Sequence, residues 1–380
     1  MLPPRGEMNL PKLAGLEIGL YKPGEEGAIL DCMRVCFNFQ PEIERWRHLY
    51  LDNPAGEAVI LLARDRGRVV SHTTFLPQRI KAFGKQGVVG HSADSMTLPE
   101  WRSKGIKSTL SAELRRIAQE RGLMAVFSYA NKQHLPILIK YEGRRPVEPF
   151  PVMVRPLKPV RAGLVFVKQW LPFSFMDQSI VQNADTPDCA VAGPIPDEST
   201  NSSTVLSPRS SWSSPTFDER HTKLFDAAEA IPPIAMVRDS AHLTWRYSDA
   251  AGSPYLQRDI STGQILDATV VVRTASLFGL RLVFVMEWFW RPEARREGVR
   301  LLGEVIRFAR SLEAHGVAAL AMPRTLQRRL LRRLGFIGVP EFLFPKTTTL
   351  NIRPEKEGGE PARWLVASNW YLTWGDGFML

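Results

Sequence analysis

The chain has 380 residues, of which 44% are hydrophobic and 23% are charged, the proportions of a soluble globular protein with two or three domains. Three cysteines (Cys32, Cys36 and Cys189) exclude a disulfide framework and favour a reducing, cytoplasmic compartment. No apolar run reaches the length of a transmembrane helix, and no Cys or His pair has the spacing of a metal site. The net charge of +10 fits an anionic ligand, a nucleic acid or an acidic membrane surface.

The first half alternates strand-like and helical patterns. The expected elements are strands within 58–80 and 87–99, a helix at 107–121, a strand at 123–130, a short helix at 133–141 and strand-like sequence at 147–155. Gly67 marks the turn between the first strands, and Gly122 suits the end of the longer helix. Strand, helix and strand in this order predict a right-handed crossover whose two strands are parallel neighbours.

Positive charge gathers where the longer helix of this half begins. Arg102, Lys104, Gly105 and Lys107 lie within six positions, shortly after Pro99 ends a strand. Free N–H groups and the helix dipole favour an anion at such a place, and glycine allows the backbone to approach it closely. The turn therefore predicts a site for an anionic ligand, and the alternative is a solvated basic turn.

The composition of the chain changes near its middle. Residues 183–216 contain eight serines and five prolines but few large apolar side chains, so they bury too little surface to offset their ordering entropy. We interpret them as a linker or a long flexible loop. The expected domains are 1–182, the linker 183–216, a second domain at 217–352 and an aromatic tail at 353–380.

The two halves share a faint repeat. Four residues recur 193 positions later, where Pro99, Glu100, Arg102 and Gly105 become Pro292, Glu293, Arg295 and Gly298. A helical apolar pattern follows each copy, and "RWRHLYLDNPAG" resembles "TWRYSDAAGSPY" ahead of them. Self-similarity with the same order of elements predicts an internal duplication.

The basic turn and its flanking elements resemble the GNAT superfamily of N-acyltransferases. The family signature is Arg or Gln, two residues, Gly, one residue, then Gly or Ala. Arg102 and Gly105 match it, Lys107 replaces the last small residue, and Ser103 stands where glycine is common. The resemblance covers 55–155 and extends more weakly to 230–350. It implies an α/β fold (a mixed α+β sheet) in two GNAT-like lobes, each with flanking helices and a splayed pair of parallel strands.

The resemblance implies acetyl-CoA, or another acyl-CoA, as co-substrate. In the family this turn holds the coenzyme A pyrophosphate, a role that falls here to Arg102, Ser103, Lys104, Gly105, Ile106 and Lys107. A strand N–H bonds the thioester oxygen, and its place before Pro99 assigns that donor to Thr97 or Leu98. Asn131 corresponds to an Asn that bonds the pantetheine at the splay, and the alternative is a cap on the short helix after it.

The resemblance also suggests groups for proton transfer. The family often has an acidic residue near the position of Asp94, which is the candidate base. Strict alternation along the strand places His91 on the opposite face, and we interpret it as a buried sheet histidine. The family's acid is a Tyr four residues before a glycine. Ile139 occupies that position here, so Tyr141 is the nearest candidate acid.

The second half departs further from the family pattern. Leu331 stands where the Tyr is expected before Gly335, and Glu297 precedes the glycine of the basic loop, where it repels phosphate. We expect a degenerate, non-catalytic lobe. The aromatic tail around Trp374 is expected to pack on the body of the protein, and the alternative is a sugar-binding surface.

These observations predict an enzyme, an N-acyltransferase that moves an acyl group, acetyl first of all, from acyl-CoA to a primary amine. The acceptor expected by fold analogy is an amino sugar or a cell-envelope precursor. One alternative is an inactive GNAT-like binding or scaffold protein, which the absence of the Tyr favours. Another is a basic nucleic-acid or membrane-surface module that uses the basic helix near 324–336.

Overall fold

The computed structural model describes residues 15–39, 41–158, 212–229, 231–248, 254–277, 279–340, 348–355 and 359–377. Two compact units are present, and each draws on more than one stretch of the chain. Unit 1 is Met1–Phe150, Pro233–Val237 and Lys346–Asn369, and unit 2 is Pro151–Pro232, Arg238–Pro345 and Trp370–Leu380. These units differ from the expected domains, because segments of each half of the sequence complete the other unit. Residues 183–211 of the expected linker lie outside the described residues.

Unit 1 is built on a mixed sheet with the strand order β1-β2-β3-β4-β5-β14-β6, and β8 pairs with β3. Its strands are β1 (Glu17–Leu20), β2 (Val59–Asp65), β3 (Arg68–Ala82), β4 (Lys85–Thr97), β5 (Ala125–Asn131), β6 (Arg145–Pro149), β8 (Ile234–Met236) and β14 (Thr348–Pro354). Strands β4 and β5 are parallel, and the other neighbours in this sheet are antiparallel. The strands expected within 58–80, 87–99 and 123–130 are thereby confirmed.

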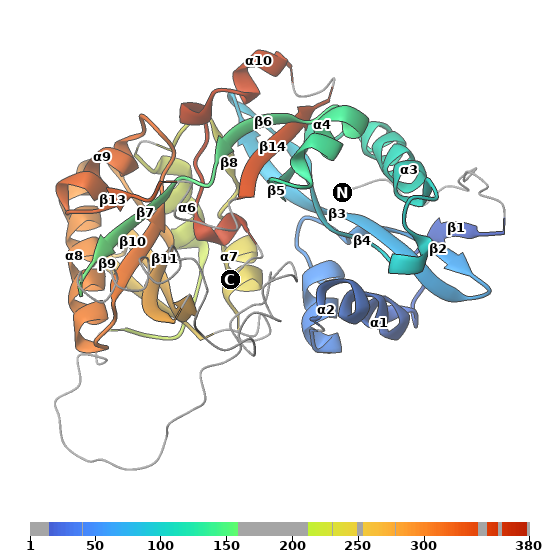
Figure 1. Cartoon of the computed structure of the whole chain (residues 1–380). Helices are drawn as coiled ribbons and strands as arrows, with labels where there is room; N and C mark the ends of the chain where they lie inside the picture. Colours follow the sequence, from blue (N-terminus) through green and yellow to red (C-terminus); the bar gives the residue numbers. More distant parts are fainter. Residues whose placement is uncertain are drawn as a thin grey trace, which may run out of the picture. The chain divides into compact units, whose positions relative to one another are not determined.

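Helices cover both faces of this sheet. Figure 1 shows α1 (Glu26–Phe37) and α2 (Ile43–Tyr50) on one face, and α3 (Ile106–Glu120) and α4 (Leu135–Glu142) on the other. Helix α3 buries Leu110, Leu114 and Ile117, which recur at the spacing of one helix face. It connects β4 to the parallel β5, so the predicted strand–helix–strand crossover is confirmed. The short helix α10 (Pro361–Trp364) completes this unit.

Unit 2 has a second mixed sheet with the strand order β13-β7-β12-β11-β10-β9, in which β11 and β12 are parallel. Its strands are β7 (Val152–Pro156), β9 (Tyr255–Thr262), β10 (Ile265–Leu277), β11 (Leu280–Trp290), β12 (Gly316–Leu320) and β13 (Ile337–Gly338). Its helices are α6 (Glu219–Ala227), α7 (Ser240–Tyr247), α8 (Arg295–Ser311) and α9 (Leu326–Arg333). Two mixed sheets with flanking helices confirm the predicted α/β class.

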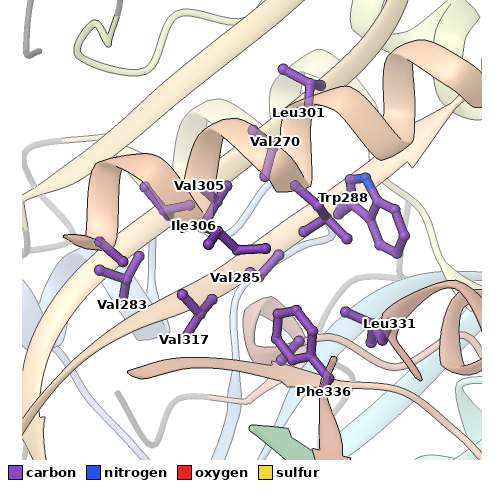
Figure 2. Packing of buried hydrophobic residues seen from close by; sticks show 14 of the residues in the cluster. Val270, Val283, Val285, Trp288, Leu301, Val305, Ile306, Val317, Leu331 and Phe336 are labelled. Atoms are coloured by element: carbon purple, nitrogen blue, oxygen red, sulfur yellow. The ribbon is translucent and has the colours of Figure 1, made fainter. Parts of the chain in front are cut away.

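The core of unit 2 lies between α8 and the sheet. Figure 2 shows Leu301, Val305 and Ile306 of α8 packed with Val283 and Val285 of β11, and all five side chains are buried. Apolar residues at helical spacing on α8 meet the apolar stretch 282–286 of β11, and this match explains why the helix lies on the sheet.

The aromatic tail packs into unit 2. Trp370, Tyr371 and Trp374 are 2%, 5% and 6% exposed, so their ring faces are unavailable to a ligand. The expectation that the tail packs on the body is confirmed, and the alternative of a sugar-binding surface is wrong. Within the described ranges, no helix has both the length and the apolar character needed to cross a membrane.

Candidate functional site

The parallel strands β4 and β5 separate along their length. They pair through Val89–Ala125, Gly90–Val126 and His91–Phe127, but β4 continues to Thr97 and β5 to Asn131. Beyond His91 the backbone groups on the facing edges therefore have no partner across the gap. A gap of this kind presents strand N–H groups to an extended ligand.

A bulge in β4 places Asp94 at this gap. Asp94 has φ +46°, and the β3–β4 register shifts between His72 and Thr74. The bulge breaks the strict alternation expected for this strand, because one extra residue re-aims the side chains after it. The Tyr50 hydroxyl of α2 donates to the Asp94 carboxylate, and His72 Nδ1 lies 2.8 Å from the Asp94 carbonyl oxygen. The carboxylate is therefore held on the face that α2 covers.

The neighbours of Asp94 stay uncharged at neutral pH. Burial, and then the negative charge of Asp94, raise the pKa of Tyr50 well above its usual value, so its hydroxyl remains a donor. His91 is buried and stacks on Phe127 with ring centroids 4.7 Å apart, and burial lowers its pKa to about 3. The interpretation of His91 as a buried sheet histidine is confirmed.

The strand N–H at the open end of β4 that β3 does not use belongs to Thr97, and it donates to the Cys36 thiol of α1. The Leu98 N–H donates to Val70 O at 2.9 Å, which places it on the β3 side of the strand. Successive N–H groups of a strand point to opposite sides, so that of Thr97 points away from β3. The assignment of Leu98 as a possible donor is therefore wrong, because its N–H is already used within the sheet. Thr97 Oγ1 is fixed by Ser71 Oγ at 2.8 Å.

The basic turn forms an open end to α3. Ser103 and Gly105 have φ +61° and +78°, and α3 begins without a side-chain cap. The first backbone hydrogen bond of α3 is donated by the Thr109 N–H to the Gly105 carbonyl oxygen, at 3.1 Å. No acceptor within the described chain takes the backbone N–H groups of 106–108, which matches the open end of a helix. A turn with left-handed residues and free N–H groups forms a concave anion site.

Three basic side chains of the turn take different positions. Arg102 is exposed, and its Nε donates to Thr97 O at 3.1 Å. Lys104 is exposed with its ammonium 4.5 Å from the centre of the Trp101 ring. Lys107 bonds His134 Nε2 instead, and burial followed by the charge of Lys107 lowers the pKa of His134 to about 4. Lys107 therefore turns toward the start of α4 and away from the mouth of the turn.

The remaining predicted residues lie around α4. Asn131 Oδ1 accepts a hydrogen bond from His134 N at 2.8 Å within the turn before α4, but α4 itself begins without a side-chain cap, and the contact of Asn131 with pantetheine stays a prediction. Tyr141 is 63% exposed on α4, with the Lys140 ammonium 5.1 Å from its ring centre. Helices α2 and α4 cover opposite faces of the sheet (Figure 1), so the structure does not bring Tyr141 to Asp94.

One residue beside the turn was missed as a functional candidate. Cys36, half-buried near the end of α1, is hydrogen-bonded by Cys32, and this bond together with the charge of Arg102 lowers its pKa to about 7. The four-residue spacing of the two cysteines is visible in the sequence. The approach to Arg102 is a tertiary contact that no local pattern reveals.

In unit 2 the parallel strands β11 and β12 also separate along their length, but the C-terminal tail occupies the space between them. Strands β11 and β12 pair through Leu282–Gly316, Val283–Val317 and Phe284–Ala318, although β11 continues to Trp290. The tail enters beside them, where Tyr371 donates to Trp288 O at 2.9 Å. The segment 370–373 lines one small cavity together with residues of both strands.

The acid of unit 2 is paired with a cation. Glu287, which lies 193 residues after Asp94, accepts a hydrogen bond from Tyr247 of α7 at 2.9 Å. Arg238 Nε lies 3.1 Å from Glu287 Oε2, and Arg238 Nη2 lies 2.6 Å from Asp376 Oδ2. All three charged side chains are buried, so the network fixes the tail in place.

Comparison with a family model decides the identity of the first part of the chain. The model of the acetyltransferase (GNAT) domain matches residues 17–141. This region is a GNAT domain. It holds the strand gap, the bulge at Asp94 and the basic turn, and it indicates an enzyme of the acyltransferase class. No protein among the curated sequences matches the chain.

Solved structures support the same fold over most of the chain. A probable N-acyltransferase from Enterococcus faecalis is 12% identical, with a TM-score of 0.57, over 89% of this chain and 72% of that one. Saccharomyces cerevisiae N-myristoyltransferase with bound myristoyl-CoA is 12% identical, with a TM-score of 0.56, over 92% and 81%. A GCN5-related N-acetyltransferase from Anabaena variabilis is 11% identical, with a TM-score of 0.54, over 89% and 72%. At these identities the likeness shows the fold.

Proposed function

We propose that unit 1 binds an acyl-CoA in the gap between β4 and β5 and transfers its acyl group to a primary amine. The observation that carries this proposal is the alignment of the Thr97 N–H, whose present acceptor is the Cys36 thiol, with the free N–H groups at the start of α3. The Thr97 N–H lies at the open end of β4, and the N–H groups of 106–108 open the helix that follows the same strand. A thioester and a diphosphate joined by an extended arm match this pair of donor sites.

The pyrophosphate lies at the basic turn in this proposal. The N–H groups of 106–108 bind its oxygens, and Arg102 and Lys104 add charge-assisted contacts. Arg102 already bonds Thr97 O, so it links the diphosphate site to the thioester site. The myristoyl-CoA bound by the yeast N-myristoyltransferase supports the use of an acyl-CoA, and acetyl-CoA is the simplest donor to test.

The reaction needs a neutral amine and a polarised carbonyl. The amine nitrogen attacks the thioester carbon, a C–N bond forms, and the oxygen becomes an oxyanion that the Thr97 N–H stabilises. Asp94 accepts the proton released from the amine, and Tyr50 holds its carboxylate in place. Collapse of the intermediate breaks the C–S bond, and coenzyme A leaves as a thiolate that takes a proton from water. The products are an amide and free coenzyme A.

The acceptor is proposed by analogy of fold. An amino sugar or the amine of a cell-envelope precursor fits a protein of two GNAT-like lobes, of which unit 2 is the degenerate copy. The reducing cytoplasm suits both the free cysteines and the donor. A thiol-release assay over amino sugars, peptides and polyamines identifies the acceptor, because every productive amine frees one coenzyme A thiol.

The direct test of this function is acetyl-CoA binding. We expect acetyl-CoA to raise the melting temperature of the wild-type protein and to leave Arg102→Glu unchanged, because the substituted carboxylate repels the diphosphate. No shift for the wild-type protein would contradict the proposal.

A catalytically inactive binding protein is the second candidate. The position of Tyr141 favours it, because this side chain is exposed on α4 and away from Asp94. Such a protein would bind acyl-CoA without releasing thiol for any amine in the panel. Thiol release that Asp94→Asn abolishes would exclude this candidate.

A further inference from the structure

A polar pocket adjoins the closed end of the β4–β5 gap in unit 1. It is a shallow hollow, and its free space of about 270 Å³ includes the open solvent at its mouth. The polar side chains that line it are Thr73, Ser92, Ser111, Arg115, Glu142, Arg144 and Arg353. Phe75, Leu114 and Val126 form its apolar wall. The pocket therefore combines an apolar approach with a charged end.

Arg144 is the unusual member of this pocket. It is 3% exposed, and neither its Nε nor its Nη1 has a hydrogen-bond acceptor among the described residues. Its Nη2 reaches Glu142 Oε2 only at 3.5 Å, the limit of a hydrogen bond. Arg353, by contrast, bonds Glu355 Oε1 at 2.6 Å and Glu142 O at 2.9 Å. Glu142 forms a long ion pair with Arg144, 3.5 Å from Nε to Oε2, and the guanidinium still has hydrogen-bond donors that a ligand or water can use.

The pocket lies where the acyl end of a bound thioester would point. Ser92 is the first β4 residue beyond the last β4–β5 pair, His91 with Phe127. Thr73, on the pocket wall, bonds Ser95 at 2.9 Å, and Ser95 is two residues from Thr97. Two residues of strand span about 7 Å. An acyl chain that starts at Thr97 and runs away from the basic turn therefore meets the pocket within a few carbon atoms.

We propose that Arg144 binds the terminal carboxylate of the acyl group, so that the preferred donor is a short dicarboxylic acyl-CoA such as succinyl-CoA. This inference rests on the proposed function and names its donor class. The planar guanidinium suits a carboxylate, and Ser92 adds a hydroxyl donor, whereas the Ser111 hydroxyl donates to Glu142 Oε1 at 2.9 Å. The apolar wall takes the methylene groups. Glu355 pairs with Arg353, so Arg115 and Arg144 face one carboxylate, Glu142, and the charge of the pocket favours an anion.

The test compares two acyl groups of four carbons that differ in charge. Calorimetric titration measures the affinities of coenzyme A, butyryl-CoA and succinyl-CoA for the wild-type protein, Arg144→Met and Glu142→Gln. We expect the wild type to bind succinyl-CoA at least about tenfold more tightly than butyryl-CoA. Arg144→Met removes this preference, and Glu142→Gln increases it, because the carboxylate that competes for Arg144 is gone. All three proteins bind coenzyme A alike.

The outcomes separate this inference from the proposed function. Equal affinities for succinyl-CoA and butyryl-CoA in the wild type, or a preference that survives in Arg144→Met, would overturn the inference and leave the pocket to water. Failure of the wild type to bind coenzyme A and both thioesters would overturn the proposed function itself. If circular dichroism shows that Arg144→Met is unfolded, Glu142→Gln decides, and an unchanged preference there counts against Arg144.

Discussion

In each unit a tyrosine donates a hydrogen bond to an acidic side chain beside the strand gap, but the surroundings of the two acids differ. In unit 1, Tyr50 holds Asp94 at the edge of an open gap, and in unit 2, Tyr247 holds Glu287 beside a gap that the tail fills. Each acid lies at or next to a register shift of its strand, and each tyrosine ends a helix of eight residues. The difference teaches that the surroundings of an acid determine whether it is available for chemistry.

Those surroundings are measurable. Asp94 is partly exposed, whereas Glu287 is 1% exposed and contacts Arg238 and Thr373 as well as Tyr247. Burial raises the pKa of Glu287 and the charge of Arg238 opposes this. A buried acid that is paired with a buried cation has a structural role, because removing either partner leaves an uncompensated buried charge. We therefore expect substitutions of Asp94 to affect turnover and those around Glu287 to affect stability.

The largest expected effect is that of Asp94→Asn on turnover. Asparagine keeps the hydrogen bond from Tyr50 but cannot accept the proton of the amine, so kcat falls by about 10²–10⁴. Glu287→Gln is the matched variant in unit 2, and we expect its kcat to stay within about twofold of wild type. Steady-state thiol release measures both. Full turnover by Asp94→Asn would show that another group is the base.

The free energy of unfolding should depend on the buried charges of unit 2, in contrast to kcat, which should depend on Asp94 of unit 1. Arg238→Met leaves Glu287 and Asp376 buried without a cation, and we expect the free energy of unfolding to fall by about 3–5 kcal/mol. Arg295→Met is the control, because its pair with Glu229 is exposed on the arginine side and contributes about 1 kcal/mol or less. Urea unfolding followed by fluorescence measures both variants. Similar losses for the two would refute the view that the tail is fixed by buried charge.

The basic turn of unit 1 and its predicted counterpart in unit 2 should also differ. Arg102→Glu places a carboxylate at the open end of α3, and we expect it to weaken acyl-CoA binding about tenfold or more. Arg295 is the counterpart of Arg102 in the repeat, and Arg295→Glu should leave the affinity unchanged. Titration of each protein with acetyl-CoA gives the dissociation constants. Equal weakening by the two substitutions would place a cofactor in both units.

A smaller effect concerns the thiol beside the turn. The pKa of Cys36 is lowered to about 7, so its reactive thiolate forms as the pH rises through that value. We expect iodoacetamide to label Cys36 faster between about pH 6 and about pH 8, and acyl-CoA to slow the labelling a few-fold by engaging Arg102. Mass spectrometry of the labelled peptide measures the rate, with Cys36→Ser as control. Labelling that acyl-CoA leaves unchanged would argue against a ligand at this turn.

The sequence predicted the elements around the turn because their signals are local. The apolar spacing of Leu110 and Leu114 and the glycine at 122 located α3 to within one residue of its bounds, Ile106–Glu120. Asp94 was a candidate base through the family resemblance, but its bulge was not expected, because a bulge depends on pairing with a distant strand.

Other features of the site depend on contacts between distant parts of the chain. The choice of Thr97 over Leu98 required the partner Val70 on β3. The burial of Arg144 depends on neighbours that include Arg353 of β14, a strand from the far end of the chain, so no local pattern indicates it. The exchange of segments between the units was also invisible, because no local pattern tells which sheet a strand joins.

The most direct test of the account is a crystal structure of the protein with bound acyl-CoA. We predict one molecule per chain, in unit 1, with its diphosphate on the backbone N–H groups of 106–108 and its thioester oxygen on the Thr97 N–H. A diphosphate bound elsewhere, or a β4–β5 gap left empty at saturating ligand, would contradict the central claim.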